Sequence, residues 1–190
     1  MAGAMPRRLS ASALTLLAAL ALTSAPAANA ADRAAWNLGE QRAVRLAAVM
    51  HNLDDGAFHG ERPLTGRQLP DALAAFSATL GAAAVSAPPS AVSVATFDRL
   101  LVQQLGAGDI AAAVQHEAWE AGLQPPASFG TEVVARFLGL RENHPFPHEE
   151  LEIYPTERIT RAQAAHSFAV ALKLGAGGAG WARETFSRFT

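Results

Sequence analysis

Hydrophobic residues recur with helical spacing along most of the chain. In residues 68–80, for example, Leu69, Ala72, Leu73 and Phe76 share one face of a helix. Clean alternation of apolar and polar residues over five or more positions, the mark of a half-buried strand, is missing. The pattern therefore predicts an all-α domain with helices at 41–50, 68–80, 97–105, 110–121, 131–138 and 162–174.

The last of these helices has the clearest start and end signals. Thr160 is a good N-cap, because its hydroxyl can accept a hydrogen bond from a free amide of the first turn. Gln163 stands three residues later and completes a capping box. Gly175 ends the segment. An apolar stripe between them is formed by Ala164, Phe168, Ala171 and Leu172.

Three other segments share the plan of this last helix. Each of the four begins with a hydrophobic residue followed by a small one, and each ends on Leu-Gly. Their starts lie roughly 30 residues apart, a spacing typical of helical-hairpin repeats that complete one another's core. The four starts are Leu64-Thr65, Val92-Ser93, Phe129-Gly130 and Ile159-Thr160.

The repeated unit resembles the S-layer homology repeat of exported bacterial cell-wall proteins. "ITRAQAAHSFAVAL" (159–172) is similar to the box that opens the second helix of that repeat, and "AWEAGLQPP" (118–126) resembles the turn before its loop. The resemblance covers roughly residues 40–175. It implies a bundle of about three helical-hairpin units that binds cell-wall polysaccharide, often a pyruvylated polymer, in grooves between the repeats.

The resemblance also implies a role for the arginine of the box. Only Arg161 stands in its place; the first copy has Gly66 there, with Arg67 one residue later. The second and third copies have Val94 and Thr131, so at most one or two sites are expected.

The residues themselves allow two interpretations of this position. An arginine beside the free amides of a first helical turn attracts anions. Alternatively, Arg161 is a solvated residue paired with Glu157. The candidate ligand-binding residues are Arg161, Thr160, Gln163 and Arg67, although capping alone accounts for Thr160 and Gln163.

Residues 1–30 have the plan of a secretory signal peptide. Arg7 and Arg8 precede an apolar run at 11–22, and "APAANA" offers a cleavage site after Ala30. The run is too short to span a bilayer, and no second long apolar run follows. We therefore expect a secreted protein of the cell wall or envelope that is not membrane-spanning.

Charge and cysteine content exclude several classes of function. The chain carries 15 Lys and Arg and 17 Asp and Glu. Because two of the arginines lie in residues 1–30, the mature charge is −4 with histidine neutral, which argues against a nucleic-acid partner. With no cysteine there is no disulfide, no cysteine nucleophile and no thiolate metal site. No nucleophile elbow is present either, so we expect a non-catalytic chain without a cofactor.

Two polar segments have some features of a metal site. His144 and His148 have i, i+4 spacing, but Pro145 and Pro147 keep the stretch out of a helix. "LDDGAFHGERP" (53–63) is a turn signal that lacks the ligand spacing of a calcium loop. No metal site is predicted.

The tail suggests a second interpretation. "GAGGAG" (175–180) has the composition of a flexible linker, and NlpC-type peptidoglycan hydrolases often carry wall-targeting repeats ahead of such a linker. Trp119 is expected in the core, whereas Trp36 and Trp181 flank the domain. The domains predicted are a signal peptide (1–30), a repeat domain (35–175) and a Gly-rich linker and tail (176–190).

The function predicted is non-catalytic anchoring to cell-wall polysaccharide or peptidoglycan. The alternatives are an accessory or targeting segment that packs on the catalytic domain of a secreted hydrolase, and a purely structural helical module.

Overall fold

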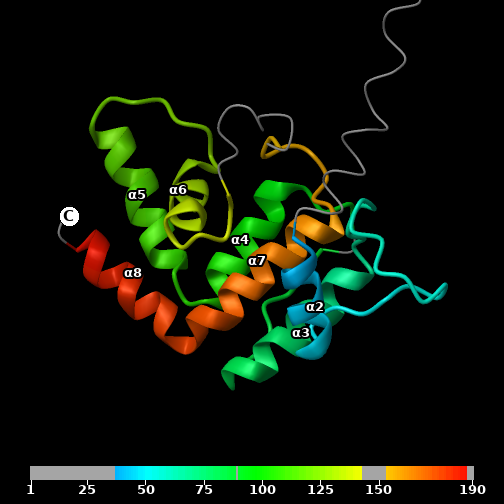
Figure 1. Cartoon of the computed structure of the whole chain (residues 1–190). Helices are drawn as coiled ribbons and strands as arrows, with labels where there is room; N and C mark the ends of the chain where they lie inside the picture. The colour runs from blue at the N-terminus through cyan, green and yellow to red at the C-terminus, as the bar shows by residue number, and fades with distance from the viewer. Residues whose placement is uncertain (1–36, 89, 143–152, 188–190) are drawn as a thin grey trace, which may run out of the picture.

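The computed structural model describes residues 37–88, 90–142 and 153–187, which form a helical domain (Figure 1). No strand occurs in these ranges, so the all-α prediction is confirmed for them. None of the helices there has the length and apolar character needed to cross a bilayer. The elements are α2 (Leu38–Leu46), α3 (Gln68–Leu80), α4 (Val94–Gln104), α5 (Gly108–Glu120), α6 (Phe129–Phe137), α7 (Arg161–Leu174), the 3-10 turn η2 (Gly175–Gly177) and α8 (Gly178–Phe186).

The predicted helices are found with small shifts at their ends. The helix at 68–80 has the predicted bounds, and the others begin one to three residues earlier than predicted. The first turn of a helix often contains polar or small residues, which the apolar period does not detect. All four predicted Leu-Gly ends have the glycine at positive φ, where an L side chain would be strained: Gly81, Gly106, Gly139 and Gly175.

The core is centred on α7, with α3 and α4 beside it. Phe168 of α7 is fully buried and lies against Phe76 of α3, with ring centroids 5.6 Å apart. On its other side it meets the edge of Phe97 of α4 at 5.3 Å. Edge-on aromatic pairs of this kind are favourable beyond the area they bury. One side chain therefore joins three helices.

α7 is buried around its whole circumference rather than along one stripe. Every residue of 161–169 is buried, and so is Ala171. Its alanines let neighbouring backbones approach closely, and a helix surrounded in this way is a core helix. The predicted apolar stripe is therefore real but describes only part of the packed surface.

Three short segments meet at the starts of α3, α4 and α7. We call these segments, residues 60–64, 92–95 and 155–162, the junction. The Leu64 amide donates to the Ile159 carbonyl (2.9 Å), and the Ile159 amide donates to the Val92 carbonyl (3.1 Å). The side chains of all three residues are buried. Antiparallel bridges at Pro63–Thr160 and Ser93–Arg158 complete the contact.

The same hydrogen bond occurs at each of the three segments of the junction. A hydroxyl oxygen accepts from the backbone amide three residues later, at 3.2–3.3 Å, in the pairs Thr65–Gln68, Ser93–Thr96 and Thr160–Gln163. Gln68 and Gln163 also accept from the amide of their threonine, both at 3.1 Å. The capping box predicted at Thr160 is confirmed. Thr65 and Gln68 form the same two bonds in the turn that leads into α3, whose N-cap is Arg67.

α5, α6 and α8 form a second group on the far side of α4 and α7 from α2 and α3 (Figure 1). α5 and α6 cross at Gly130 of α6. A Cβ atom there would lie 2.0 Å from the Ala111 carbonyl oxygen and 2.9 Å from the Gln115 amide nitrogen. The absence of a side chain is what permits this crossing.

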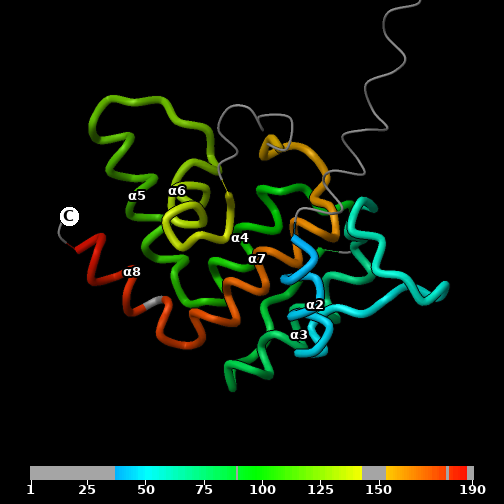
Figure 2. Tube along the Cα trace, viewed as in Figure 1, coloured from blue at the N-terminus to red at the C-terminus, as the bar shows by residue number. Residues whose placement is uncertain are grey.

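The Gly-rich segment predicted as a flexible linker is instead structured. Residues 175–177 form η2, and 178–186 form α8, which continues from the end of α7 (Figure 2). Trp181 stacks on Phe137 of α6 with centroids 4.6 Å apart, and Ala182 is fully buried. Composition alone suggested a linker, but the aromatic residues after it bury enough surface to order the segment.

The tryptophan predicted for the core is on the surface. Trp119, near the end of α5, is 54% exposed. Its neighbour Ala118 occupies the buried position instead. Trp181 is about half exposed, and Trp36 lies outside the described residues.

Gly130→Ala is expected to destabilise the domain by more than about 2 kcal/mol, because the new methyl group would strike backbone atoms that cannot move separately. Gly39→Ala in α2 is the matched control. Its Cβ meets nothing within 4 Å, and alanine favours the helix by about 0.5–1 kcal/mol. Denaturant unfolding measures both effects, and equal stabilities of the two variants would contradict the close crossing.

Candidate functional site

Arg161 is buried, not exposed. Only 2% of the residue is accessible. Its Nε donates to the Phe58 carbonyl (2.8 Å) and its Nη2 to the His51 carbonyl (2.5 Å). The guanidinium lies 4.6 Å from the centre of the Phe58 ring. The expected pairing with Glu157 is not formed, and neither is the expected exposed position in the first turn.

This arginine thus ties the segment 51–58 to the start of α7. The two carbonyls are neutral acceptors, and no carboxylate in the described ranges forms an ion pair with the guanidinium. Burial, with a smaller effect from the charge of Arg62, lowers the pKa of Arg161. A guanidinium stays charged even so, because its pKa is normally far above neutral pH. The start of α7 therefore holds a buried positive charge.

A hollow of about 190 Å³ adjoins this charge. We call it the Arg161 hollow. One wall is the segment 49–54, and the other is the start of α3. It is smaller than the roughly 300–1,000 Å³ of drug-sized pockets, so it would admit one ring-sized group. The residues that line it outside 49–54 are Leu64, Gln68, Asp71, Ala72 and Arg161.

A second, wider hollow of about 500 Å³ lies next to the first. We call it the Arg67 hollow; its lining is Leu53, Asp54, Asp55, Arg62, Arg67 and Gln68. The two hollows share Leu53, Asp54 and Gln68. The structure thus brings the two predicted arginines to adjoining hollows. Arg67 is exposed at the start of α3 and makes no hydrogen bond or ion pair with any described residue.

The other two predicted site residues have a capping role. Thr160 and Gln163 are each less than a tenth exposed. The Thr160 hydroxyl donates to Gln163 Oε1 (2.8 Å), in addition to the bonds of the capping box. Neither residue is among those that line the two hollows. Capping, one of the two interpretations given above, accounts for both.

The turn between the hollows is held by His59. Its Nε2 is 2.6 Å from Asp55 Oδ2, and its Nδ1 is 2.9 Å from Glu61 Oε1. Hydrogen bonds to these two carboxylates raise the pKa of His59. The residue has φ +51°, which is uncommon for a side chain with a Cβ. The turn predicted at Asp54-Asp55-Gly56 is found here.

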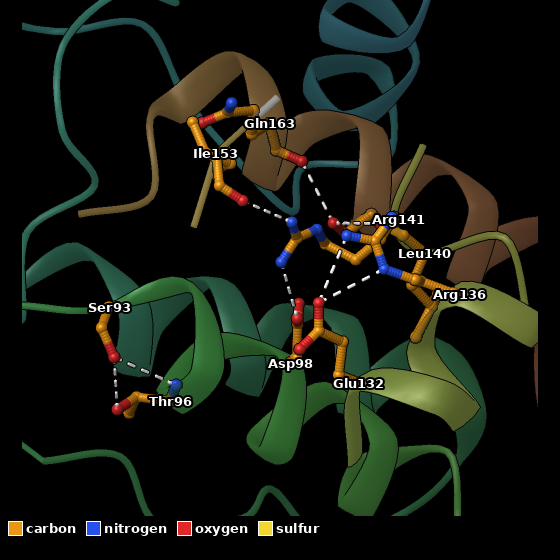
Figure 3. Close-up of polar contacts among 10 residues, drawn as sticks. Ser93, Thr96, Asp98, Glu132, Arg136, Leu140, Arg141, Ile153 and Gln163 are labelled. Carbon is orange, nitrogen blue, oxygen red and sulfur yellow. Dashed lines mark hydrogen bonds and ion pairs between the residues drawn. The ribbon is translucent and has the colours of Figure 1, made fainter. Parts of the chain in front are cut away.

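A buried ion pair that the sequence did not reveal joins α4 to the end of α6 (Figure 3). Arg141 Nη1 is 3.2 Å from Asp98 Oδ2, and its Nη2 donates to the Ile153 carbonyl (2.8 Å). Asp98 is 2% exposed, and its Oδ1 has no hydrogen-bond partner among the described residues. Burial raises the pKa of Asp98 to about 6, although Arg141 opposes the shift. A charged residue next to Phe97, on the apolar face of α4, was the available signal.

No metal centre is evident in the described ranges, where no group of three or more His, Asp or Glu is arranged to hold an ion. His144 and His148 lie outside these ranges, as do residues 1–30.

Arg161→Lys is expected to lower stability by about 1.5–3 kcal/mol, because an ammonium group cannot reproduce the two-carbonyl contact and the ring contact together. Arg67→Lys, on an exposed side chain, is the control and should change stability by less than about 0.5 kcal/mol. Chemical unfolding measures the stability of both variants. Equal losses of stability in Arg161→Lys and Arg67→Lys would contradict the structural role of Arg161.

Asp98→Asn is expected to change how stability depends on pH. Because the pKa of Asp98 is raised to about 6 from 3.8, the folded protein holds this proton more tightly than the unfolded chain. Wild-type stability should therefore gain about 1.5 kcal/mol from Asp98 as the pH falls from 6 to 4.5. The Asn variant lacks this gain, and Asp71→Asn, on an exposed carboxylate, retains it. Parallel pH profiles of wild type and Asp98→Asn would refute the raised pKa.

No family model, no curated protein and no solved structure matches the chain.

Proposed function

We propose that the chain is a non-catalytic module of the bacterial cell envelope that binds an acidic cell-wall polysaccharide at the Arg161 and Arg67 hollows. The observation that carries the proposal is the buried guanidinium of Arg161 beside an open hollow, with no carboxylate partner among the described residues. In a site of reduced dielectric such a charge attracts an acidic group over several ångströms.

The rest of the lining suits a saccharide. Asp54 and Asp71 can accept hydrogen bonds from sugar hydroxyls, while Leu53 can contact the apolar face of a ring. Two acidic side chains near the arginine disfavour a simple anion. A ligand with both hydroxyl groups and one acidic group satisfies the whole lining, and the wider Arg67 hollow has room for a neighbouring sugar unit.

The junction supports the proposed bundle of three S-layer-homology-like units. Three of the four predicted starts, at Leu64, Val92 and Ile159, bond to one another and are followed by equivalent caps. The fourth, Phe129-Gly130, opens α6 away from the junction, where it packs on α5. The contacts at the junction thus support units that begin at Leu64, Val92 and Ile159. Export through a signal peptide at 1–30 is part of the same proposal.

One observation favours the accessory-segment alternative. Trp181 is about half exposed beside Phe137 and Phe186, so an aromatic cluster reaches the surface near the C-terminus. A catalytic partner domain that docks on α8 would cover it. In that case the chain would bind a protein and no glycan.

Sedimentation with purified bacterial sacculi tests the proposal. The chain from residue 31 onward should co-sediment with intact sacculi and lose binding when the secondary polysaccharide is stripped. Arg67→Ala should weaken binding about tenfold, as for a lost charge-assisted contact. Arg161 is left intact because its loss would also disturb the fold.

Arg42→Ala is the matched control, since Arg42 is an exposed arginine on α2 that lines neither hollow. If both variants bind like the wild type, the ligand does not occupy these hollows. If the wild type does not sediment with intact sacculi, the anchoring proposal fails and the accessory role takes its place.

A further inference from the structure

His166 occupies a position where both ring nitrogens face acceptors. It lies in the second turn of α7 and is 6% exposed. Nδ1 is 3.0 Å from both carboxylate oxygens of Glu40 on α2, and Nε2 is 3.1 Å from the Gly139 carbonyl at the end of α6. Neither acceptor can donate a proton. Both bonds therefore require the doubly protonated imidazolium.

The neutral imidazole cannot keep both bonds. It carries one N–H, so it can donate either to Glu40 or to Gly139, and its other nitrogen then presents a lone pair to an oxygen. The other acceptor is then left without its hydrogen bond. Because this bond is partly buried, the loss lowers stability more than it would at the surface. Deprotonation must therefore weaken either the Glu40 contact or the Gly139 contact of His166.

α2 is the element less able to stay in place. Of its nine residues, only Gln41 and Val44 are buried, while Leu38 and Leu46 are 63% and 78% exposed. Asn37, the residue before α2, provides a further polar link to α7, because its side chain donates to the Ala162 carbonyl. The end of α6, in contrast, belongs to a helix packed against both α4 and α5. α2 therefore depends on the Glu40–His166 pair more than α6 depends on the Gly139 bond.

The charges around the pair favour the imidazolium. Burial alone would lower the pKa of His166, but the hydrogen bond and charge of Glu40, the charge of Glu142 and the Gly139 carbonyl raise it. Burial would likewise raise the pKa of Glu40, but His166 and Lys173 lower it. Since the folded pKa of His166 lies above 6.5, the stabilisation is complete below pH 6.5 and is lost as the pH rises through the folded value.

We propose that His166 is a pH-sensitive clamp: its imidazolium holds α2 against α7, and its neutral form loosens α2. Residues 49–54, which follow α2, form one wall of the Arg161 hollow. Arg161 and the buried Val49 and Met50 keep that wall on the core, so only its α2 end would loosen, and alkaline pH would weaken binding in the hollow. This consequence rests on the proposed function, whereas the clamp itself does not.

Hydrogen–deuterium exchange of the ligand-free protein tests the clamp independently of any binding. The protein without residues 1–30, which keeps every described residue, is compared at pH 6.0 and 8.5 after correction for intrinsic exchange rates. Protection of α2 should fall on the order of tenfold more than protection of α5, which is the internal reference. If α2 and α5 lose protection in parallel, the clamp is refuted.

Two variants separate His166 from the other histidines. His166→Gln has one donor and one acceptor, like the neutral ring, so α2 should be poorly protected at both pH values. His59→Gln removes a histidine held within the 55–61 turn and should leave the pH dependence of α2 unchanged. A normal α2 response in His166→Gln, or its loss in His59→Gln, would overturn the assignment.

A third variant covers the case in which His166→Gln does not fold. Glu40→Gln removes the charge that favours the imidazolium, so release of α2 should move to lower pH. In the wild type the midpoint of α2 release should coincide with the imidazole titration of His166 followed by NMR. Release that does not follow this titration would refute the clamp.

Discussion

The backbone contact at the junction is the interaction on which the rest of the structure depends. Ile159 lies between Leu64 and Val92 and bonds to both, so the starts of α3, α4 and α7 are held at one place. From there the three helices run together far enough for Phe76, Phe97 and Phe168 to meet. Further bonds from Arg161 and Ala162 to the carbonyls of Arg62 and Gly60 place the long 47–67 connection over the start of α7. Without the junction, neither the contact between Phe76, Phe97 and Phe168 nor the walls of the two hollows would be held in place.

Buried charges then distinguish this arrangement from other packings of the same helices. α7 carries Arg161 and His166, which reach the 51–58 segment, α2 and the end of α6, while Asp98 and Arg141 join α4 to the chain after α6. Burying a charge is costly unless its partners are in place. Each of these groups therefore penalises any arrangement in which its distant partner is missing. The same cost makes the domain responsive to pH, because Asp98 and His166 both have raised pKa values.

The two sides of the core have different surfaces. The hollows with their arginines and carboxylates are lined by residues of 49–72 and Arg161, whereas Trp181 of α8 stacks on Phe137 of α6. α2 and α3 lie on one side of α4 and α7, and α6 and α8 lie on the other (Figure 1). The two alternative functions proposed above therefore use different surfaces, and α7 connects these surfaces through the core.

The sequence by itself determined the helical class, most of the helices, the capping box at Thr160 and the glycine stops, because these depend on interactions within about four residues along the chain. It also named Arg161 and Arg67 as separate candidates, and the structure places them at adjoining hollows. Tertiary structure alone decided that Arg161 is buried, since its carbonyl partners are 103 and 110 residues away. It likewise decided the His166–Glu40 pair, 126 residues apart, and the ordering of α8, which needs Phe137 as a packing partner. Local patterns carry no information about which distant residues will pack against a side chain, and that packing decides whether the side chain is buried.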